Sequence, residues 1–533
     1  MTDNPVKDHY ENLVELKYQL YNSLFLTLPL DAVEQTSLLL PLLDEASHAG
    51  LKAGLNPKQI LVEFFKSHRP DLDEQKQAQF LFKIIQYIER QVVLIDALED
   101  AAYEKIHRTE ESNKLRQLTE RVVSEGQQEQ LKNILASFGA RVILTAHPTQ
   151  FYPGTVLAII TDLTDAVQAN DIGLARSLLQ QLGNTPFFQK EKPSPLDEAG
   201  QLSWYLGNVF YPAIGDVLDY LNDYQEDREA TEDQLLSIGF WPGGDRDGNP
   251  FVTTTITRQV ADKLRARIVE CYHKEVRELK RRLSFVGVAS EIEAIEKQLY
   301  NELTHERGDC FSNPEALIQD LNRIQQTLEK DFQGLFVDRL ISFKRKITAF
   351  GFHFASLDIR QDSRVLQSTL DNIVTSNIEL LPSHFPTLTE KEKIQALLAV
   401  SSGIDVNKLS EMIARDTLDS LRTIREIQES NGERACNRYI ISNCREPLDI
   451  ARLIALFQLS GWSLDNLTVD IVPLFETIDD LKSAGANLGV LYSVPEYRAH
   501  LARRGNKQTV MLGFSDGTKD GGYLMANWAI YAA

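Results

Sequence analysis

The sequence has few cysteines, and none lie in a pattern that binds zinc or builds a disulfide framework. Its four cysteines are widely spaced among 533 residues, and no CxxC pair is present: Cys271, Cys310, Cys436 and Cys444. Zinc sites and the disulfide frameworks of small secreted proteins need closely spaced or multiply paired cysteines. The sequence therefore predicts a protein of a reducing compartment without a cysteine-based zinc site.

Long hydrophobic runs are also missing. No stretch of roughly 18 apolar residues, the length that marks a membrane-spanning helix, is present. The first residues, MTDNPVKDHYENL, are polar and acidic. They are unlike a signal peptide, which has a basic start and an apolar centre. We therefore expect a soluble, cytoplasmic protein.

Positive charge is scarce as well, since 56 Lys and Arg residues stand against 76 Asp and Glu, a formal net charge of −20. Such a chain lacks the basic surface that binds nucleic acid or anionic lipid. An anionic substrate would have to be held by individually placed Arg or Lys residues, or by a metal ion. Basic residues in glycine-rich contexts are therefore informative.

Helical periodicity dominates the sequence. From residue 1 to about 135, apolar residues recur at spacings of three, four and seven, as in the series Leu81, Ile84, Ile88 and Ile95. The same periodicity returns later, for example over 260–283. We expect a helical amino-terminal region at 1–140 and one integrated unit at 141–533.

Six short apolar runs interrupt the helices, and each ends in polar residues with Gly, Pro or Asp. They lie within 141–150, 235–250, 352–363, 438–447, 468–480 and 509–522. Alternation of such runs with helices predicts a parallel sheet, because parallel strands need crossover connections. The layout favours a TIM-type barrel with about six of eight strands and large helical insertions. A doubly wound sheet is the competitor, but no GxGxxG motif follows the first run.

The motif GGDRDGNP at 243–250 is either a surface turn or an anion site. Gly, Asp and Asn are typical of turns. The anion reading makes Arg246 the clamp for a carboxylate or phosphate, with Asp245 and Asp247 orienting its guanidinium.

Other polar residues follow the remaining apolar runs. His147 in TAHPT either transfers protons or caps a helix. In LDIRQDS we expect Arg360 and Arg364 to come after a strand ending near Ile359, where they contact an anion or pair with Asp358 or Asp362.

Two acidic positions follow runs that are adjacent in sequence order. Glu476 ends PLFE, and Asp516 opens the glycine-rich loop SDGTKDGG, which also carries Lys519. This loop lacks the GxxxxGK[ST] spacing of a P-loop. Because adjacent parallel strands lie side by side, both carboxylates can converge on one Mg2+ or Mn2+.

Taken together and in order, TAHPTQ, GGDRDGNP, LDIRQ, PLFETIDDL and SDGTKDGG resemble the phosphoenolpyruvate carboxylase family. VVLIDALEDAAYEKI at 92–106 is similar to that family too, so the resemblance runs from about residue 85 to the last residue. It implies a Mg2+- or Mn2+-dependent lyase that forms oxaloacetate and phosphate from phosphoenolpyruvate and bicarbonate. It also implies a homotetramer.

The resemblance also implies roles for individual residues. His147 and Lys519 match the family's catalytic positions, and Glu476 and Asp516 match its metal ligands. Arg360 matches an arginine that contacts the substrate phosphate. Arg246 belongs to the GGDRDGNP signature, which implies that it shapes the same pocket.

The resemblance is incomplete. Family members continue for several hundred residues and carry an F-H-G-R-G-G loop after the seventh strand, which this sequence lacks. We therefore expect an amino-terminal portion of such an enzyme, inactive by itself. A non-catalytic relative and a phosphotransferase acting on phosphoenolpyruvate are the alternatives. The first would not need His147, Glu476, Asp516 and Lys519 together, and the second would need a nucleotide or a phosphohistidine partner.

Overall fold

The computed structural model describes residues 5–26, 36–107, 114–145, 152–187, 193–221, 235–304, 309–377, 379–401, 404, 409 and 411–533. The chain divides into two compact units, Met1–Gln128 with Pro148–Lys192, and Glu129–His147 with Pro193–Ala533. The units interleave in sequence, whereas the sequence predicts one boundary at residue 140. None of the described helices is long and apolar enough to cross a membrane.

The first unit is helical, as the periodicity predicts. Its helices are α1 (Pro5–Tyr10), α2 (Leu16–Leu26), α3 (Thr36–Lys52), α4 (Pro57–His68), α5 (Glu74–His107), α6 (Lys114–Ser124), α8 (Gly154–Gln168) and α9 (Ile172–Asn184), with a π-helical turn η1 (Glu11–Glu15). The main core of the unit packs α5 against α8 and α9, through residues such as Leu94, Leu163 and Leu179. A smaller cluster around Phe64 and Phe80 joins α3, α4 and α5.

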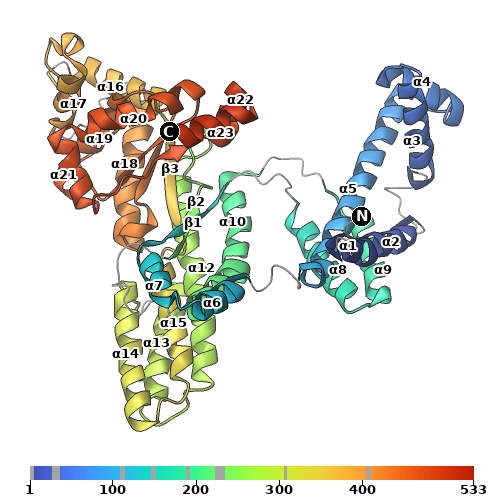
Figure 1. Ribbon diagram of the computed structural model, residues 1–533, viewed down its shortest axis with the longest axis horizontal. Coiled ribbons are helices and arrows are strands. Elements are labelled where there is room, and N and C mark those ends of the chain that lie inside the picture. The colour runs from blue at the N-terminus through green and yellow to red at the C-terminus, as the bar shows by residue number, and fades with distance from the viewer. Residues whose placement is uncertain are drawn as a thin grey trace. The chain divides into compact units, whose positions relative to one another are not determined.

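The second unit contains a six-stranded parallel sheet whose strands follow the sequence order (Figure 1). Its strands are β1 (Ala140–Leu144), β2 (Leu236–Phe240), β3 (Ser356–Asp362), β4 (Arg438–Ser442), β5 (Asp470–Phe475) and β6 (Met511–Leu512). All six predicted strands are confirmed. The sheet is an open, curled portion of a TIM-type barrel, as the sequence predicts.

Helices connect and cover the strands. They are α7 (Gln128–Ser137), α10 (Pro195–Tyr205), α11 (Tyr211–Tyr220), α12 (Thr254–Lys280), α13 (Ala289–Thr304), α14 (Pro314–Asp331), α15 (Val337–Phe350), α16 (Ser363–Ser376), α17 (Glu390–Leu398), α18 (Met412–Asn431), α19 (Pro447–Leu459), α20 (Ile478–Tyr492), α21 (Pro495–Arg503), α22 (Phe514–Gly521) and α23 (Tyr523–Ala532). Short turns are η2 (Leu206–Phe210), η4 (Phe385–Thr387), η6 (Glu433–Ala435) and η7 (Leu464–Asn466).

The two faces of the sheet bury different residues, because side chains alternate along a strand. Tyr439, Ile441 and Ile471 join the large core shared with the helices. Ile440 and Val472, which are register partners, form a separate cluster on the opposite, inner face. Arg360 is the register partner of Ile440, so it also lies on the inner face.

Two local predictions are wrong. The third strand begins at Ser356 rather than near Phe352, because Phe354 takes a left-handed conformation with φ 60° that a strand cannot include. The strand also continues past Ile359, to Asp362. The glycine-rich segment after the sixth run is not a loop, since residues Phe514–Gly521 form helix α22. Gly513 and Gly522 flank this helix, and its interior glycines did not prevent it from forming.

The sheet has two unpaired edges among the described residues, β1 and β6. Helix α23 follows β6 and is apolar on both faces. Ala526 and Ala529 are buried, whereas Leu524 is 82% and Trp528 64% exposed. A helix that is apolar all round is typical of a buried position, so this face lacks a covering layer in the described part of the chain.

Candidate functional site at the carboxyl ends of the strands

The polar motifs converge at the carboxyl ends of the strands, where parallel α/β folds place their ligands. The GGDRDGNP loop follows β2, Arg360 lies in β3, Glu476 follows β5, and Asp516 and Lys519 lie on α22 after β6. We call this region the mouth of the barrel. Arg360 lies inside its strand rather than after it, which corrects the sequence prediction.

The GGDRDGNP loop continues the sheet beyond β2. The Arg246 amide donates to the carbonyl of Arg360 at 2.9 Å, and the Arg360 amide donates to the carbonyl of Gly244 at 3.1 Å. Asp245 and Arg360 form a parallel bridge. A Cβ on Gly244 would lie 2.1 Å from the carbonyl oxygen of Asp358, so only glycine allows this close approach. The segment is therefore a turn, closed by the Gly244 and Asp245 amides on the Trp241 carbonyl, that rejoins the sheet through one parallel bridge at Asp245.

Arg360 is enclosed by residues of this loop. Its Nε lies 2.8 Å from Asp245 Oδ1, and its Nη2 lies 3.3 Å from Asp247 Oδ2. Its guanidinium stacks over the Trp241 ring, 4.9 Å from the centroid. Asp245 and Asp247 therefore orient Arg360, not Arg246 as the sequence predicts.

Arg246 points to the opposite face, because consecutive residues of an extended chain alternate. Its side chain is only 6% exposed and pairs with Asp416 of α18. Burial lowers the pKa of Arg246, and its Nε and Nη1 have no hydrogen-bond partner among the residues that the structure describes. Within the described residues, Arg246 thus links the loop to the helical layer. Asp416 was missed because it lies in an ordinary amphipathic helix.

Arg364 lies at the start of α16, beside the mouth. It pairs with Asp362 at 2.6 Å, one of the two partners that the sequence offered, and its side chain is 78% exposed. Asp362 also caps α16 by accepting from the Arg364 amide. Arg364 is therefore an exposed cation near the mouth that forms a bidentate pair with the capping residue Asp362.

Glu476 ends β5 and is half-buried. The backbone N–H of Asn443, a residue with φ 52°, donates to its Oε2 at 2.6 Å. Burial raises the pKa of Glu476, and the carboxylates of Asp516 and Asp247 raise it further, against the effect of that hydrogen bond and of Arg360. These interactions bring residues that follow β2, β5 and β6 into one electrostatic group.

Asp516 and Lys519 lie one turn apart on α22 and pair at 2.9 Å. Their side chains are 49% and 75% exposed. Asp520 instead has a structural role, since its Oδ2 accepts a hydrogen bond from the Ile478 amide at the start of α20. Lys519 and Arg364 are thus both largely exposed cations at the predicted site. His147 lies outside the described residues.

The chemistry at Glu476 and Asp516 fits a hard divalent cation. Both are oxygen ligands, and the pKa of Glu476 is raised by its burial and, to a smaller extent, by the carboxylates of Asp516 and Asp247. No three His, Cys, Asp or Glu side chains of the described residues form a complete metal centre. Two carboxylates completed by water and substrate oxygens are the usual arrangement for Mg2+.

Apolar and ionic layers support the mouth from below. The inner-face cluster of Ile440, Val472 and Leu474 packs with Trp241. The Trp241 Nε1–H donates to Asp358 Oδ2 at 3.3 Å, and Asp358 pairs with Arg141 of β1 at 2.5 Å. Burial raises the pKa of Asp358, which Arg141 opposes. Trp241 thus connects the floor of the mouth to a buried ion pair across the sheet.

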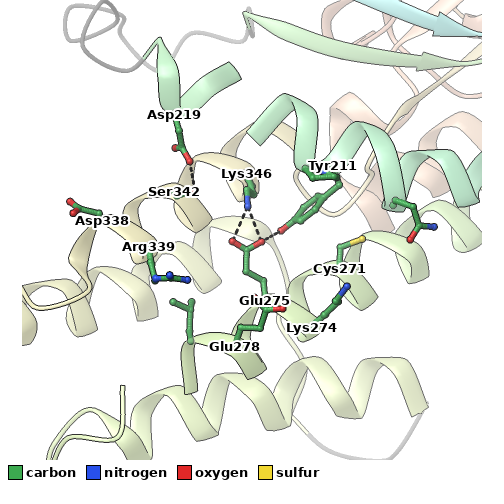
Figure 2. A pocket seen from close by; sticks show the side chains of 14 residues that line it. Tyr211, Asp219, Cys271, Lys274, Glu275, Glu278, Asp338, Arg339, Ser342 and Lys346 are labelled. Carbon is green, nitrogen blue, oxygen red and sulfur yellow. Dashed lines mark hydrogen bonds and ion pairs between the residues drawn. The ribbon is translucent and has the colours of Figure 1, made fainter. Parts of the chain in front are cut away.

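A cavity of about 580 Å³ lies among α11, α12 and α15, and none of the residues that line it belongs to the mouth (Figure 2). Glu275 projects between two donors, Lys346 at 3.0 Å and the Tyr211 hydroxyl at 2.5 Å. A Cβ on Gly215 would lie 2.4 Å from Lys346 Cε, so Gly215 leaves the space that Lys346 occupies. In this triad the Glu275 carboxylate is paired with the Lys346 ammonium group and accepts a hydrogen bond from Tyr211.

A partial parallel barrel with ionic groups at the carboxyl ends of its strands places the chain among proteins with a TIM-type barrel. Comparison with known proteins is more specific. The family model for phosphoenolpyruvate carboxylase matches residues 76–305 and 289–533. The chain belongs to the phosphoenolpyruvate carboxylase family, which confirms the resemblance in the sequence motifs.

Curated relatives agree. The chain is 30% identical over 479 residues to a phosphoenolpyruvate carboxylase of Nitrosomonas eutropha, covering 78% of this chain and 51% of that protein. It is 28% identical over 488 residues to that of Nitrosomonas europaea, covering 78% and 51%. It is 29% identical over 447 residues to that of Aliivibrio salmonicida, covering 74% and 48%. The chain thus spans about half the length of these relatives.

Proposed function

We propose that this chain carries the metal-binding and phosphate-binding part of a phosphoenolpyruvate carboxylase. The whole enzyme would convert phosphoenolpyruvate and bicarbonate to oxaloacetate and phosphate, in the cytoplasm and as a homotetramer. One observation carries the proposal: Arg360 interacts electrostatically with Glu476 and Asp516 couples to the same carboxylate, at the mouth of a parallel barrel of this family.

The inner-face arginine would bind the phosphate of the substrate. Arg360 is already oriented by Asp245 and Trp241, so little side-chain freedom is lost on binding. A guanidinium pairs bidentately with a phosphate group. Arg364 adds a second positive charge beside the mouth. Together they would supply the local positive potential that a chain of net charge −20 otherwise lacks.

Glu476 and Asp516 would hold Mg2+ or Mn2+, which supplies stabilisation of the negative charge that develops on the enolate oxygen. Lys519 lies one helical turn from Asp516, with its ammonium group accessible to solvent. In that position it would neutralise the anionic substrate next to the carboxylate ligands.

His147 would accept the proton of carboxyphosphate, so that this intermediate breaks down to CO2 and phosphate. The released CO2 then has to reach the enolate without being lost to water. Trp241 and the apolar cluster of Ile440, Val472 and Leu474 line the inner face of the sheet below the mouth. These side chains would exclude water and offer CO2 an apolar surface.

We propose that the 533-residue chain is inactive by itself, because the sheet has unpaired edges at β1 and β6 and the face of α23 is uncovered in the described part of the chain. Bicarbonate-dependent oxaloacetate formation with Mn2+, coupled to malate dehydrogenase, tests both statements. The assay compares this chain with one translated to its natural stop codon. We expect activity only in the longer chain, and its loss in a Lys519→Ala variant of that chain.

Activity of the 533-residue chain at a rate close to that of the longer chain would overturn the proposed inactivity. A folded longer chain without activity would overturn the carboxylase assignment. In that case a non-catalytic role for this relative would be the remaining explanation.

A further inference from the structure

The two aspartates that contact Arg360 are held very differently. Asp245 is fixed, since its Oδ1 accepts from Arg360 Nε at 2.8 Å and from the Asp247 amide at 3.2 Å. Its backbone is also locked against β3 by the parallel bridge to Arg360. Its side chain is only 17% exposed. Removing Asp245 from Arg360 would require the loop to leave the sheet.

Asp247 has a single, longer contact. Its Oδ2 lies 3.3 Å from Arg360 Nη2, and its side chain is 26% exposed. Its carboxylate makes no other hydrogen bond or ion pair among the described residues. Asp247 can therefore leave Arg360 without breaking any backbone hydrogen bond.

The guanidinium would stay in place after Asp247 had left. Its Nε remains on Asp245, and its plane remains stacked over Trp241. The outer edge of the guanidinium would then offer free N–H groups on the inner face of the barrel. That is the geometry that an incoming phosphate oxygen needs.

We propose that Asp247 is a built-in competitor for the phosphate site at Arg360, which it occupies until a phosphate group displaces it. The inference rests on the proposed function, because it takes Arg360 to be the phosphate-binding residue. The competitor makes the site selective. A phosphate dianion brings two charged oxygens to the guanidinium and can replace a carboxylate, whereas a weakly binding monoanion cannot.

The test measures binding of inorganic phosphate to the 533-residue chain by titration calorimetry. An Asp247→Asn variant removes the competing charge and keeps the shape of the side chain. We expect its phosphate affinity to rise about fivefold, the factor expected for removing one partly exposed ion pair. An Asp247→Asn/Arg360→Gln double variant should lose this gain. Acetate should bind neither the wild-type chain nor the double variant measurably.

Two controls separate this role from simpler effects. Asp479→Asn removes the same unit of charge from a side chain that is 92% exposed on α20, and should leave the phosphate affinity unchanged. Thermal unfolding should show that Asp247→Asn folds as the wild type does.

Each remaining outcome has a defined meaning. Equal phosphate affinity of the wild type and Asp247→Asn would overturn the competitor role and leave the proposed function standing. An equal gain in Asp479→Asn would overturn it too, by showing an effect of net charge. Absence of phosphate binding in every variant would overturn Arg360 as a phosphate site, and the activity assay on the longer chain would then judge the proposed function separately.

Discussion

The two halves of the mouth are built to different degrees. On the β2–β3 side, Arg360 is held by Asp245, by Trp241 and by a backbone ladder. On the β5–β6 side, β6 is only two residues long, and Asp516 and Lys519 form an exposed pair on a short helix. The first half is ordered by its own neighbours. The second half contains an exposed ion pair and Glu476, a carboxylate that makes no ion pair with the described residues.

This difference indicates that the β5–β6 side depends on a bound cation more than the β2–β3 side depends on a bound anion. An arginine among aspartates is preorganised in the free protein, so it can bind an anion with little rearrangement. Burial and the nearby carboxylate of Asp516 instead raise the pKa of Glu476, and a bound cation would offset that unfavourable negative charge. We therefore expect substitutions on the β2–β3 side to change stability, and substitutions on the β5–β6 side to change metal binding more than stability.

The largest effect is expected from Asp416→Asn. This change leaves Arg246, which is 6% exposed, without its charged partner. Because Asp416 itself is 36% exposed, the pair is only partly buried, and its loss should lower the free energy of unfolding by about 1–2 kcal/mol. Urea denaturation followed by circular dichroism measures this change.

Asp419→Asn on the same helix is the matched control, since Asp419 is 50% exposed and lies 3.4 Å from Arg422. It should cost at most about 0.5 kcal/mol. Similar losses in both variants would show that Arg246 and Asp416 do not form a special link.

Metal binding should respond most to the β5–β6 carboxylates. Asp516→Asn removes an oxygen anion from the proposed metal site and should weaken Mn2+ binding by about tenfold or more. Electron paramagnetic resonance of free Mn2+ measures the affinity without any need for turnover. Asp479→Asn, at an exposed position of α20, should leave it unchanged. An unaltered affinity in Asp516→Asn would place the metal elsewhere.

Glu476→Gln should make the chain slightly more stable at neutral pH. The folded protein raises the pKa of Glu476, so folding favours its protonated form. The stability that this group contributes is fully present below its unfolded pKa, near 4.3, and is lost as the pH rises through the raised folded value. Glutamine avoids that loss and can still accept from the Asn443 amide.

Melting temperatures of the wild type and Glu476→Gln should therefore coincide at low pH and separate above it, with the variant higher. A variant that is less stable than the wild type at pH 7 would contradict this assignment. In that case the hydrogen bond from Asn443 would outweigh the cost of burying the charge.

The smallest effect on stability is expected from Lys519→Ala. Its side chain is 75% exposed and, within the described part of the chain, its ammonium group pairs only with Asp516 on the same helix. Such pairs contribute little, so the unfolding free energy should change by less than about 0.5 kcal/mol. A large loss of stability would mean that Lys519 has a structural role that its surroundings do not indicate.

Much of the fold could be predicted from the sequence, because buried parallel strands and amphipathic helices have distinct local patterns. All six strands and the helical first unit followed from these patterns. The ends of elements followed less well. Glycines suggested a loop where α22 forms, because helix propensity is weak and packing of the segment overrides it.

The candidate site could be predicted at the level of positions but not of contacts. Strand ends placed Arg360, Glu476 and Asp516 together, because the carboxyl ends of parallel strands share one edge of a sheet. The partner of Arg246 could not be predicted, since Asp416 lies 170 residues away and on an unremarkable helix face. The roles of Trp241 and Asn443 were missed for the same reason.

The sequence by itself determined the order of strands and helices, the family and the set of charged residues at the mouth, because these follow from local periodicity and from short motifs. Only the tertiary structure decided which arginine of the site is accessible. Alternation along the extended loop after β2 sends Asp245 and Asp247 to the inner face with Arg360, and sends Arg246 to the helical layer. That choice depends on pairing with β3 and on α18, which meet the loop only in the folded chain.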